Sequence, residues 1–209
     1  MNWFRLLVKK VVCFFITVFY PYKVHNKENL IQGKCVLIGN HFRIIDCVPI
    51  FRMYHGKAFF LVKKEAFKGK LFSSFLKNYG AISVDRDNIE MKTVMEGMRV
   101  LKNGYPLTIY PEGTRNKKNE DIQPIKGGAV LFALKTNAPV VPIITAHKQR
   151  IFRKTHLIIG KPVNLDEYYG KKTTSEDFDK ITEILYQAMV DLRCELLKIL
   201  DSKKKKVKN

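Results

Sequence analysis

Short apolar runs recur through the middle of the chain, and each has the length of a β-strand. Between them lie segments in which apolar residues recur every three or four positions, as on one face of an α-helix. Strands that alternate with helices predict one α/β domain with a mostly parallel sheet flanked by helices. The expected strands are Cys35–Gly39, Ala58–Val62, Ala81–Val84, Pro106–Tyr110, Val140–Ile144 and Leu157–Ile159.

Helical periodicity appears between these strands and again after the last one. Asp87, with Glu90 three residues later, has the spacing of a cap at the start of one helix. Another helix is expected to end before Pro139, since proline cannot continue it. The expected helices cover residues 71–79, 91–101, 128–136 and 178–199.

The N-terminus combines basic and aromatic residues with an apolar run, Val11–Tyr20. That run is about half of the ~20 residues that a spanning helix needs. The small-residue cleavage site of a secretory signal is also missing after it. We therefore expect an interfacial helix that lies in one leaflet of a membrane. A soluble amphipathic helix packed on the domain and a tilted span using residues 3–20 are the alternatives.

The net charge of +19, from 38 Lys plus Arg against 19 Asp plus Glu, predicts an anionic partner. Nucleic acid, an anionic membrane and phosphorylated substrates all qualify, and a solvated basic surface is the alternative. The aromatic residues argue against nucleic acid. They sit in apolar runs such as Phe14–Phe15 and Phe59–Phe60, and are not interleaved with basic residues as stacking platforms.

These features divide the chain into an N-terminal anchoring segment (residues 1–24), an α/β domain (25–201) and a basic tail (202–209). The lysines of the tail fit either a solvated, disordered end or attraction to anionic lipid. The four cysteines have neither metal-ligand nor redox spacing, which favours buried thiols in a reducing compartment.

His41 and Asp46 directly follow a predicted strand, in the segment Asn40–Asp46. Histidine suits proton transfer near neutral pH, and an imidazole needs a carboxylate to fix its tautomer. Five residues within one regular helix would place the two side chains about 140° apart. We therefore expect His41 in the loop and Asp46 in the first turns of the next helix.

Three further segments lie at or beside strand ends, where open α/β sheets bind ligands. Arg86 and Arg115 offer fork-shaped donors for phosphate oxygens, with surface ion pairs as the alternative. Gly113 would let the backbone approach a ligand closely. The three segments are Gly80–Arg86, Tyr110–Arg115 and Val141–Ile144.

Taken in order, the four segments resemble the motifs of the glycerolipid acyltransferase family, specifically the 1-acyl-glycerol-3-phosphate acyltransferases. Those motifs are Asn-His-x4-Asp, a segment from Gly to Arg, Pro-Glu-Gly-Thr-Arg, and an apolar segment with Val-Pro. The resemblance covers roughly residues 30–165 and extends to Ile125–Ala129. Lys63 matches a basic position of the family. Two positions depart from it: Arg43 stands where Ser is usual, and Ser83 where Phe is common.

The resemblance implies transfer of an acyl group from a thioester to lysophosphatidic acid, without a metal or organic cofactor. His41 would be the general base and Asp46 would orient it. Glu112, Gly113 and Thr114 would shape the pocket, and their backbone donors would stabilise the oxyanion. The residues expected to bind the acceptor phosphate are Lys63, Arg86 and Arg115.

The expected partners are lysophosphatidic acid, an acyl-carrier protein or acyl-coenzyme A as donor, and an anionic membrane surface, without nucleic acid. The expected location is the cytoplasmic face of the cell membrane, as a monotopic or peripheral protein. Arg43 adds a cation near the base and would favour a more anionic acceptor. The alternatives are another lysolipid or glycerol-3-phosphate as acceptor, or a non-catalytic basic protein that binds membranes or nucleic acid.

Overall fold

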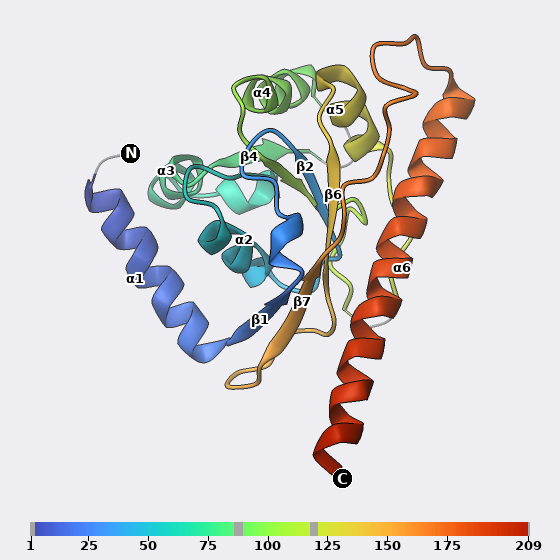
Figure 1. Ribbon diagram of the computed structural model, residues 1–209. Helices are drawn as coiled ribbons and strands as arrows, with labels where there is room; N and C mark the ends of the chain where they lie inside the picture. Colours follow the sequence, from blue (N-terminus) through green and yellow to red (C-terminus); the bar gives the residue numbers. More distant parts are fainter. Residues whose placement is uncertain (1–2, 86–89, 118–120, 209) are drawn as a thin grey trace.

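The computed structural model describes residues 3–85, 90–117 and 121–208, and within these ranges seven strands form one sheet. The strands are β1 (Tyr22–His25), β2 (Val36–Gly39), β3 (Phe59–Lys63), β4 (Ala81–Val84), β5 (Leu107–Ile109), β6 (Val140–Thr145) and β7 (Thr155–Ile159). Their order across the sheet is β1-β7-β6-β2-β5-β3-β4 (Figure 1). Neighbouring strands are parallel except β6 and β7, so the prediction of a mostly parallel α/β sheet is confirmed.

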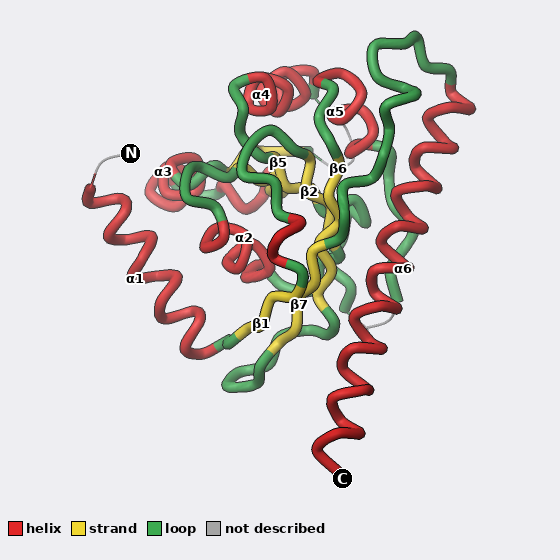
Figure 2. Tube along the Cα trace, in the orientation of Figure 1, coloured by secondary structure: helices red, strands yellow, loops and turns green. Residues whose placement is uncertain are grey.

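Helices flank both faces of this sheet, as Figure 2 shows. They are α1 (Trp3–Phe19), α2 (Cys47–Met53), α3 (Lys70–Asn78), α4 (Met91–Lys102), α5 (Gly128–Thr136) and α6 (Ser175–Lys208). Short 3₁₀ turns occupy Lys27–Asn29, Ile44–Asp46 and Lys64–Phe67. Asp87, the expected cap of α4, lies outside the described residues, and Glu90 directly precedes the helix.

Two hydrophobic clusters cover the two faces of the sheet. Side chains alternate along a strand, so Val36 and Ile38 of β2 face one cluster while Leu37 faces the other. The first cluster contains buried side chains of α4, α5 and α6, and the second contains Ile50 and Tyr54 at α2. Because β2 is buried on both faces, the loop that follows it leaves the sheet at a fixed place.

The edge strand β1 was missed by the sequence analysis. It is only four residues long, and Lys23 and His25 give it a polar character. Its register is fixed by parallel pairing with β7, in which Val24 opposes Leu157. Since β7 returns antiparallel from β6, β1 also runs against the direction of β2.

The last helix, α6, continues through the lysine block to Lys208, where the sequence analysis placed a separate tail from residue 202. Lysine is a good helix former, and positive charge near a helix C-terminus interacts favourably with the helix dipole. Figure 1 shows the end of α6 projecting past the sheet. In the structure the helix therefore includes the residues that the sequence analysis assigned to a basic tail.

The N-terminal helix α1 lies beside α2, where the Arg52 guanidinium donates to the Thr17 hydroxyl over 2.7 Å. Cys13 is buried, whereas Phe14 and Phe15 are exposed. None of the helices in the described ranges has both the length and the apolar character needed to cross a bilayer.

Candidate active site

The carboxyl ends of β2 and β6 lie side by side, because Gly39 opposes Ile143 in the parallel register. One residue further on, the buried Asn40 side chain joins the ends of these two strands. Its Nδ2 donates to the Thr145 carbonyl over 2.9 Å, and its Oδ1 accepts from the Thr145 N–H over 2.9 Å. This clamp fixes the point at which His41 leaves the sheet, at the edge where α/β sheets bind ligands.

The structure brings His41 and Asp46 together. The chain turns back through the 3₁₀ turn Ile44–Asp46, and His41 Nδ1 lies 2.8 Å from Asp46 Oδ2. The His41 side chain is 12% exposed and that of Asp46 is 2% exposed. The histidine is thus within reach of a substrate while its partner is shielded from water.

The Asp46 carboxylate is held by several donors besides His41. Oδ2 also accepts from the backbone N–H groups of Phe42 over 2.7 Å and Arg43 over 2.8 Å. Oδ1 accepts from the side-chain amide of Gln149, which is buried. Because a carboxylate only accepts, the neutral imidazole carries its proton on Nδ1 and presents a lone pair at Nε2. In the part of the chain that the structure describes, no group bonds to Nε2.

Tyr110 packs against one face of the His41 imidazole. Its ring stacks on that of His41 with centroids 4.3 Å apart and an interplanar angle of 18°. Burial, followed by the nearby charge of Asp46, raises the pKa of Tyr110 well above its ordinary value, so the phenol stays neutral. Gly39 makes room for it, since a Cβ there would lie 2.9 Å from the Ile143 carbonyl oxygen and 3.4 Å from Tyr110 Cε1.

The loop after β5 lies against the histidine loop. The Asn116 N–H donates to the His41 carbonyl over 2.7 Å, which fixes the Pro-Glu-Gly-Thr-Arg segment beside the imidazole. Gly113 has φ +68°, a left-handed conformation that glycine adopts without strain. Thr114 and Arg115 are exposed, so the Arg115 guanidinium is available to an anionic ligand.

Lys126 is a cation of this loop that the sequence analysis did not assign to the site. Its N–H donates to the Pro111 carbonyl over 2.9 Å. Its side chain runs along Gly113, where a Cβ would lie 3.3 Å from Lys126 Cε. The signal in the sequence was the segment Ile125–Ala129, which resembles the family without indicating a role for the lysine.

Glu112 is a buried carboxyl next to the histidine loop, with 5% of its surface exposed. Burial raises its pKa to about 7, and the charge of Asp46 acts in the same direction. The backbone N–H groups of Gln123 and His41 lower the pKa, but less than burial raises it. Within the described ranges neither carboxyl oxygen has a hydrogen bond of ordinary geometry. Glu112 is therefore a group that holds a proton near neutral pH.

Of the remaining expected phosphate ligands, Lys63 stands further along the same edge. Lys63 ends β3, the strand next to β5, and its exposed ammonium pairs with Glu65 over 2.8 Å. Arg86 lies outside the described residues. Because β2, β5 and β3 are parallel neighbours, they end at one edge of the sheet, where His41 and Arg115 follow β2 and β5 and Lys63 ends β3.

Comparisons with known proteins identify the family of this chain. The model of the Acyltransferase family matches residues 21–146. The 1-acyl-sn-glycerol-3-phosphate acyltransferase of Bacillus subtilis is 32% identical over 181 residues, which cover 83% of this chain and 89% of that protein. The protein of the same name from Cocos nucifera is 28% identical over 177 residues, covering 81% of this chain and 57% of that protein.

A solved structure shows the same fold. The 1-acyl-sn-glycerophosphate acyltransferase PlsC from Thermotoga maritima superposes with a TM-score of 0.65 at 20% sequence identity. The match covers 93% of this chain and 80% of that chain. The family model covers more than half of the sequence, including the segment with His41 and Asp46 and the loop after β5. This chain therefore belongs to the Acyltransferase family.

Proposed function

We propose that this protein transfers a fatty acyl group from a thioester to the free hydroxyl of 1-acyl-glycerol-3-phosphate, producing phosphatidic acid. The observation that carries this proposal is the pair of His41 and Asp46, with Nδ1 and Oδ2 2.8 Å apart and Asp46 held by three further donors. The names of the relatives from Bacillus subtilis and Cocos nucifera support the choice of acceptor.

In the proposed reaction, His41 Nε2 takes the proton of the acceptor hydroxyl as its oxygen attacks the thioester carbonyl carbon. The tetrahedral intermediate collapses, the carbon–sulfur bond breaks, and the thiolate leaves with the proton that His41 returns. Asp46 stabilises the imidazolium that forms in between. General base catalysis of this kind contributes about 10²–10⁴-fold in rate.

The acceptor phosphate is assigned to the cations along the same sheet edge. Arg115 offers a bidentate fork, and Lys63 and Arg86 supply further positive charge. Lys126 joins this group, because it lies along Gly113 in the same loop. Glu112, Gly113 and Thr114 form the wall of the pocket, with backbone donors for the oxyanion.

The substrate and the product both reside in a lipid leaflet, so we place the protein on a membrane surface. The exposed apolar side chains of α1, among them Trp3, Phe14 and Phe15, would enter the interfacial layer. All four cysteines are free thiols, which fits the cytoplasmic face of the membrane. Acyl-coenzyme A and acyl-carrier protein are both candidate donors there.

The test is acylation by the purified protein, read by mass spectrometry. The acceptors are lysophosphatidic acid, other lysolipids and glycerol-3-phosphate, each supplied with acyl-coenzyme A or acyl-carrier protein. We expect phosphatidic acid as the main product, and no product above background from His41→Ala. Preferred acylation of another acceptor would replace lysophosphatidic acid in the proposal, and the absence of any acyl transfer would refute it.

A further inference from the structure

The connection between β6 and β7 is a hairpin, and we call residues 150–154 the hairpin tip. Two large apolar side chains lie in this tip. Ile151 is 57% exposed and Phe152 is 69% exposed. Arg150 and Arg153 form the bridge that closes the turn, and these two residues and Lys154 are also exposed. A turn on a water-facing surface is normally polar. Two adjacent large apolar residues between cations therefore indicate that the tip contacts something other than water.

The backbone holds Phe152 in this position. It has φ +56°, a left-handed conformation that is rare for a bulky residue. Its N–H donates to the carbonyl of Phe19 over 2.7 Å, and the two rings have centroids 5.5 Å apart. The hairpin tip is thereby fixed to the last turn of α1, and Figure 1 shows the two meeting at the same end of the molecule.

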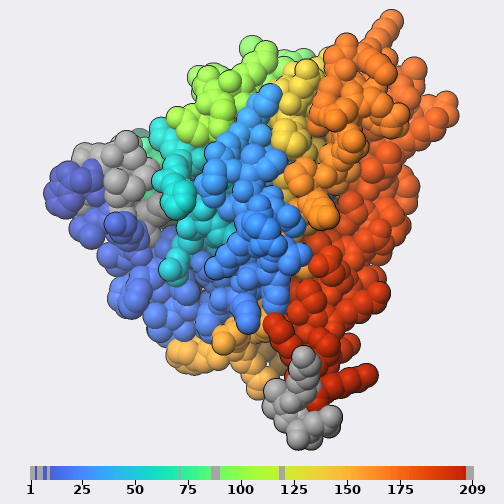
Figure 3. All heavy atoms as spheres, in the orientation of Figure 1, coloured from blue at the N-terminus to red at the C-terminus, as the bar shows by residue number. Residues whose placement is uncertain are grey.

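The hairpin tip continues an apolar surface that begins on α1. Exposed apolar residues of this helix recur at the spacing of one helical face. They are Trp3, Leu7, Val11, Phe14, Phe15, Val18 and Phe19, with Val12 beside them. In Figure 3 the spheres of the hairpin adjoin those of α1 at the lower edge of the view. Together α1 and the hairpin tip form one surface, which we call the apolar ridge.

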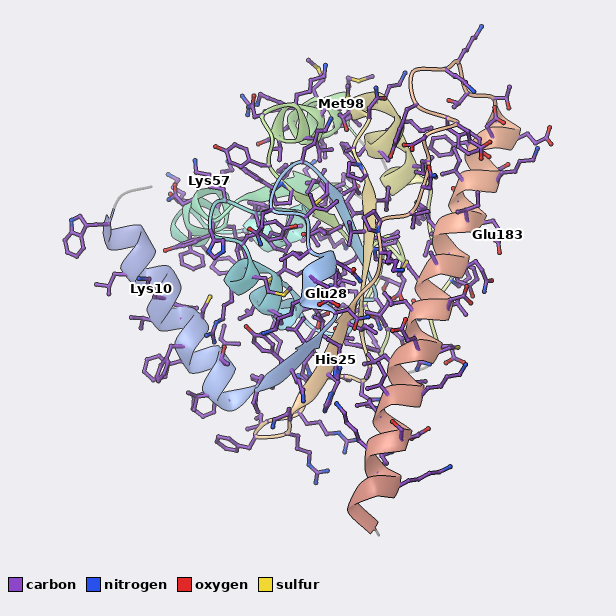
Figure 4. The ribbon with its side chains drawn as sticks, viewed as in Figure 1. Lys10, His25, Glu28, Lys57, Met98 and Glu183 are labelled. Carbon is purple, nitrogen blue, oxygen red and sulfur yellow. The ribbon has the colours of Figure 1, made fainter. Side chains whose placement is uncertain are left out.

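Positive charge lies next to the apolar ridge. His25 of β1, labelled in Figure 4, lies against His156 of β7, with His25 Nε2 and His156 Nδ1 2.9 Å apart. The pKa of His156 is lowered by burial, then by His25, and then by the ammonium groups of Lys203, Lys23 and Lys154. These three lysines come from α6, β1 and the hairpin, so cations of three separate elements act on His156.

We infer that the hairpin tip is a second membrane-inserting element, which enters a leaflet of anionic phospholipid together with α1. The occupant follows from the surface itself, because a continuous apolar ridge bordered by cations matches acyl chains beneath anionic headgroups. This inference rests on the proposed function, in which the acceptor lies in a leaflet.

The hairpin also connects the membrane surface to the candidate active site. Gln149, directly before the tip, bonds to Asp46, and Thr145 at the start of the hairpin is clamped by Asn40. Insertion of Ile151 and Phe152 therefore places His41 at a fixed distance from the headgroup plane.

The test compares two double variants of the full chain on phosphatidylcholine vesicles, with and without phosphatidylglycerol. In the hairpin variant, Ile151→Ser is combined with Phe152→Asn, since asparagine tolerates a left-handed backbone. The control combines Met91→Ser and Met95→Ser, which are 72% and 64% exposed, on helix α4. Figure 1 shows α4 at the opposite end of the molecule from the hairpin. We expect the partition coefficient of the hairpin variant to fall about 30-fold or more, and that of the control to stay unchanged. Wild-type partitioning of the hairpin variant, or an equal loss in the control, would overturn the inference.

Two further measurements separate the inference from the proposed function. The hairpin variant should lose turnover on vesicles in proportion to its partitioning, but keep the wild-type rate with a water-soluble short-chain lysophosphatidic acid. An equal loss on the soluble acceptor would mean that the tip acts on the active site and not on the membrane. In a Trp3→Phe background, the fluorescence of the indole introduced by Phe152→Trp should be quenched by brominated lipid, and an unquenched signal would contradict insertion. If the wild-type protein acylates nothing, the proposed function fails, whereas partitioning and quenching still decide the role of the hairpin.

Discussion

Gln149 donates a hydrogen bond to Asp46 Oδ1, the carboxylate oxygen that His41 does not contact. Gln149 is buried, and within the described ranges its own Oε1 has no partner. A hydrogen bond to a buried charged group contributes about 1.5–3 kcal/mol. We therefore predict that Gln149→Ala lowers kcat about 10-fold or more while KM for both substrates changes little. Steady-state kinetics on a water-soluble acceptor would measure both constants.

The matched variant Gln149→Glu distinguishes orientation of Asp46 from simple packing. It keeps the size of the side chain but places a second carboxyl against Asp46. Two carboxylates in contact repel each other, so its activity should recover toward acidic pH, where the new carboxyl is protonated. The proposed role of Gln149 in catalysis would be contradicted by an unchanged kcat in Gln149→Ala. It would also be contradicted if the activity of Gln149→Glu depended on pH as that of the wild type does.

Replacing either member of the His41 and Asp46 pair should stop turnover without unfolding the protein. His41→Ala removes the base, with an expected loss of about 10²–10⁴-fold. Asp46→Asn removes the charge that stabilises the imidazolium and allows the wrong tautomer, with a comparable expected loss. Activity is read by product formation and folding by near-ultraviolet circular dichroism. A variant that retains more than about a tenth of wild-type turnover would contradict the assignment, given these magnitudes.

Much of the sheet could be predicted from the sequence because its strands are continuous apolar runs. Val36–Gly39 and Val140–Thr145 are buried along their whole length, which makes them visible without tertiary information. The strand Tyr22–His25 was not visible, since its place in the sheet depends on pairing with β7, more than a hundred positions away along the chain. The sequence analysis ended the last helix at residue 199, because the lysine block that follows has no apolar residues at helical spacing, whereas α6 continues to Lys208.

The candidate site also contains residues that the sequence could predict and residues whose role depends on the fold. His41 and Asp46 are local in sequence, and the requirement for a loop between them follows from helix geometry. Tyr110 and Lys126 lie in segments that resemble the family, but their contacts with His41 and Gly113 depend on the fold. Gln149 could not be found at all. It reaches Asp46 only because β2 and β6 are neighbours, and nothing in the surrounding sequence marks it.

Glu112 gives a prediction for the pH dependence of stability. Its pKa rises from an ordinary value of 4.5 in the unfolded chain to about 7 in the folded protein, mainly through burial. Between these values the folded state keeps a proton that the unfolded state has lost, so stability falls as pH rises and levels off above the folded value. The difference corresponds to roughly 3 kcal/mol. Below the pKa of Glu112 in the unfolded chain, both states carry the proton, and the carboxyl no longer makes the stability depend on pH.

Glu112→Gln replaces the carboxyl with a neutral amide of the same shape and should remove this pH dependence. We expect the variant to match the wild type in unfolding free energy at acidic pH and to exceed it above about pH 7. Glu183→Gln, at an exposed position of α6 (Figure 4), is the control and should leave the profile unchanged. Urea unfolding at about pH 4 and about pH 8 measures the effect. If the unfolding free energy of Glu112→Gln falls with pH as steeply as that of the wild type, another group causes the pH dependence.

Arg115 is the residue whose substitution tests the phosphate assignment most directly. It is exposed in the loop that Asn116 fixes to the His41 carbonyl, so its guanidinium can reach an acceptor beside the imidazole. Arg115→Ala should raise KM for lysophosphatidic acid about 10- to 100-fold, as expected for loss of a charge-assisted hydrogen bond.

The specificity of that loss decides which substrate Arg115 binds. The KM for the acyl donor should change much less, and Arg115→Lys should recover only part of the affinity, because a point charge lacks the bidentate fork. Lys117→Ala removes a cation from the same loop and serves as the control, since Lys117 is exposed just beyond Asn116. The decisive quantity is the ratio of the two KM changes, measured with each substrate varied in turn. A defect confined to the donor would move the phosphate site of the acceptor away from this loop and assign Arg115 to the phosphates of the donor.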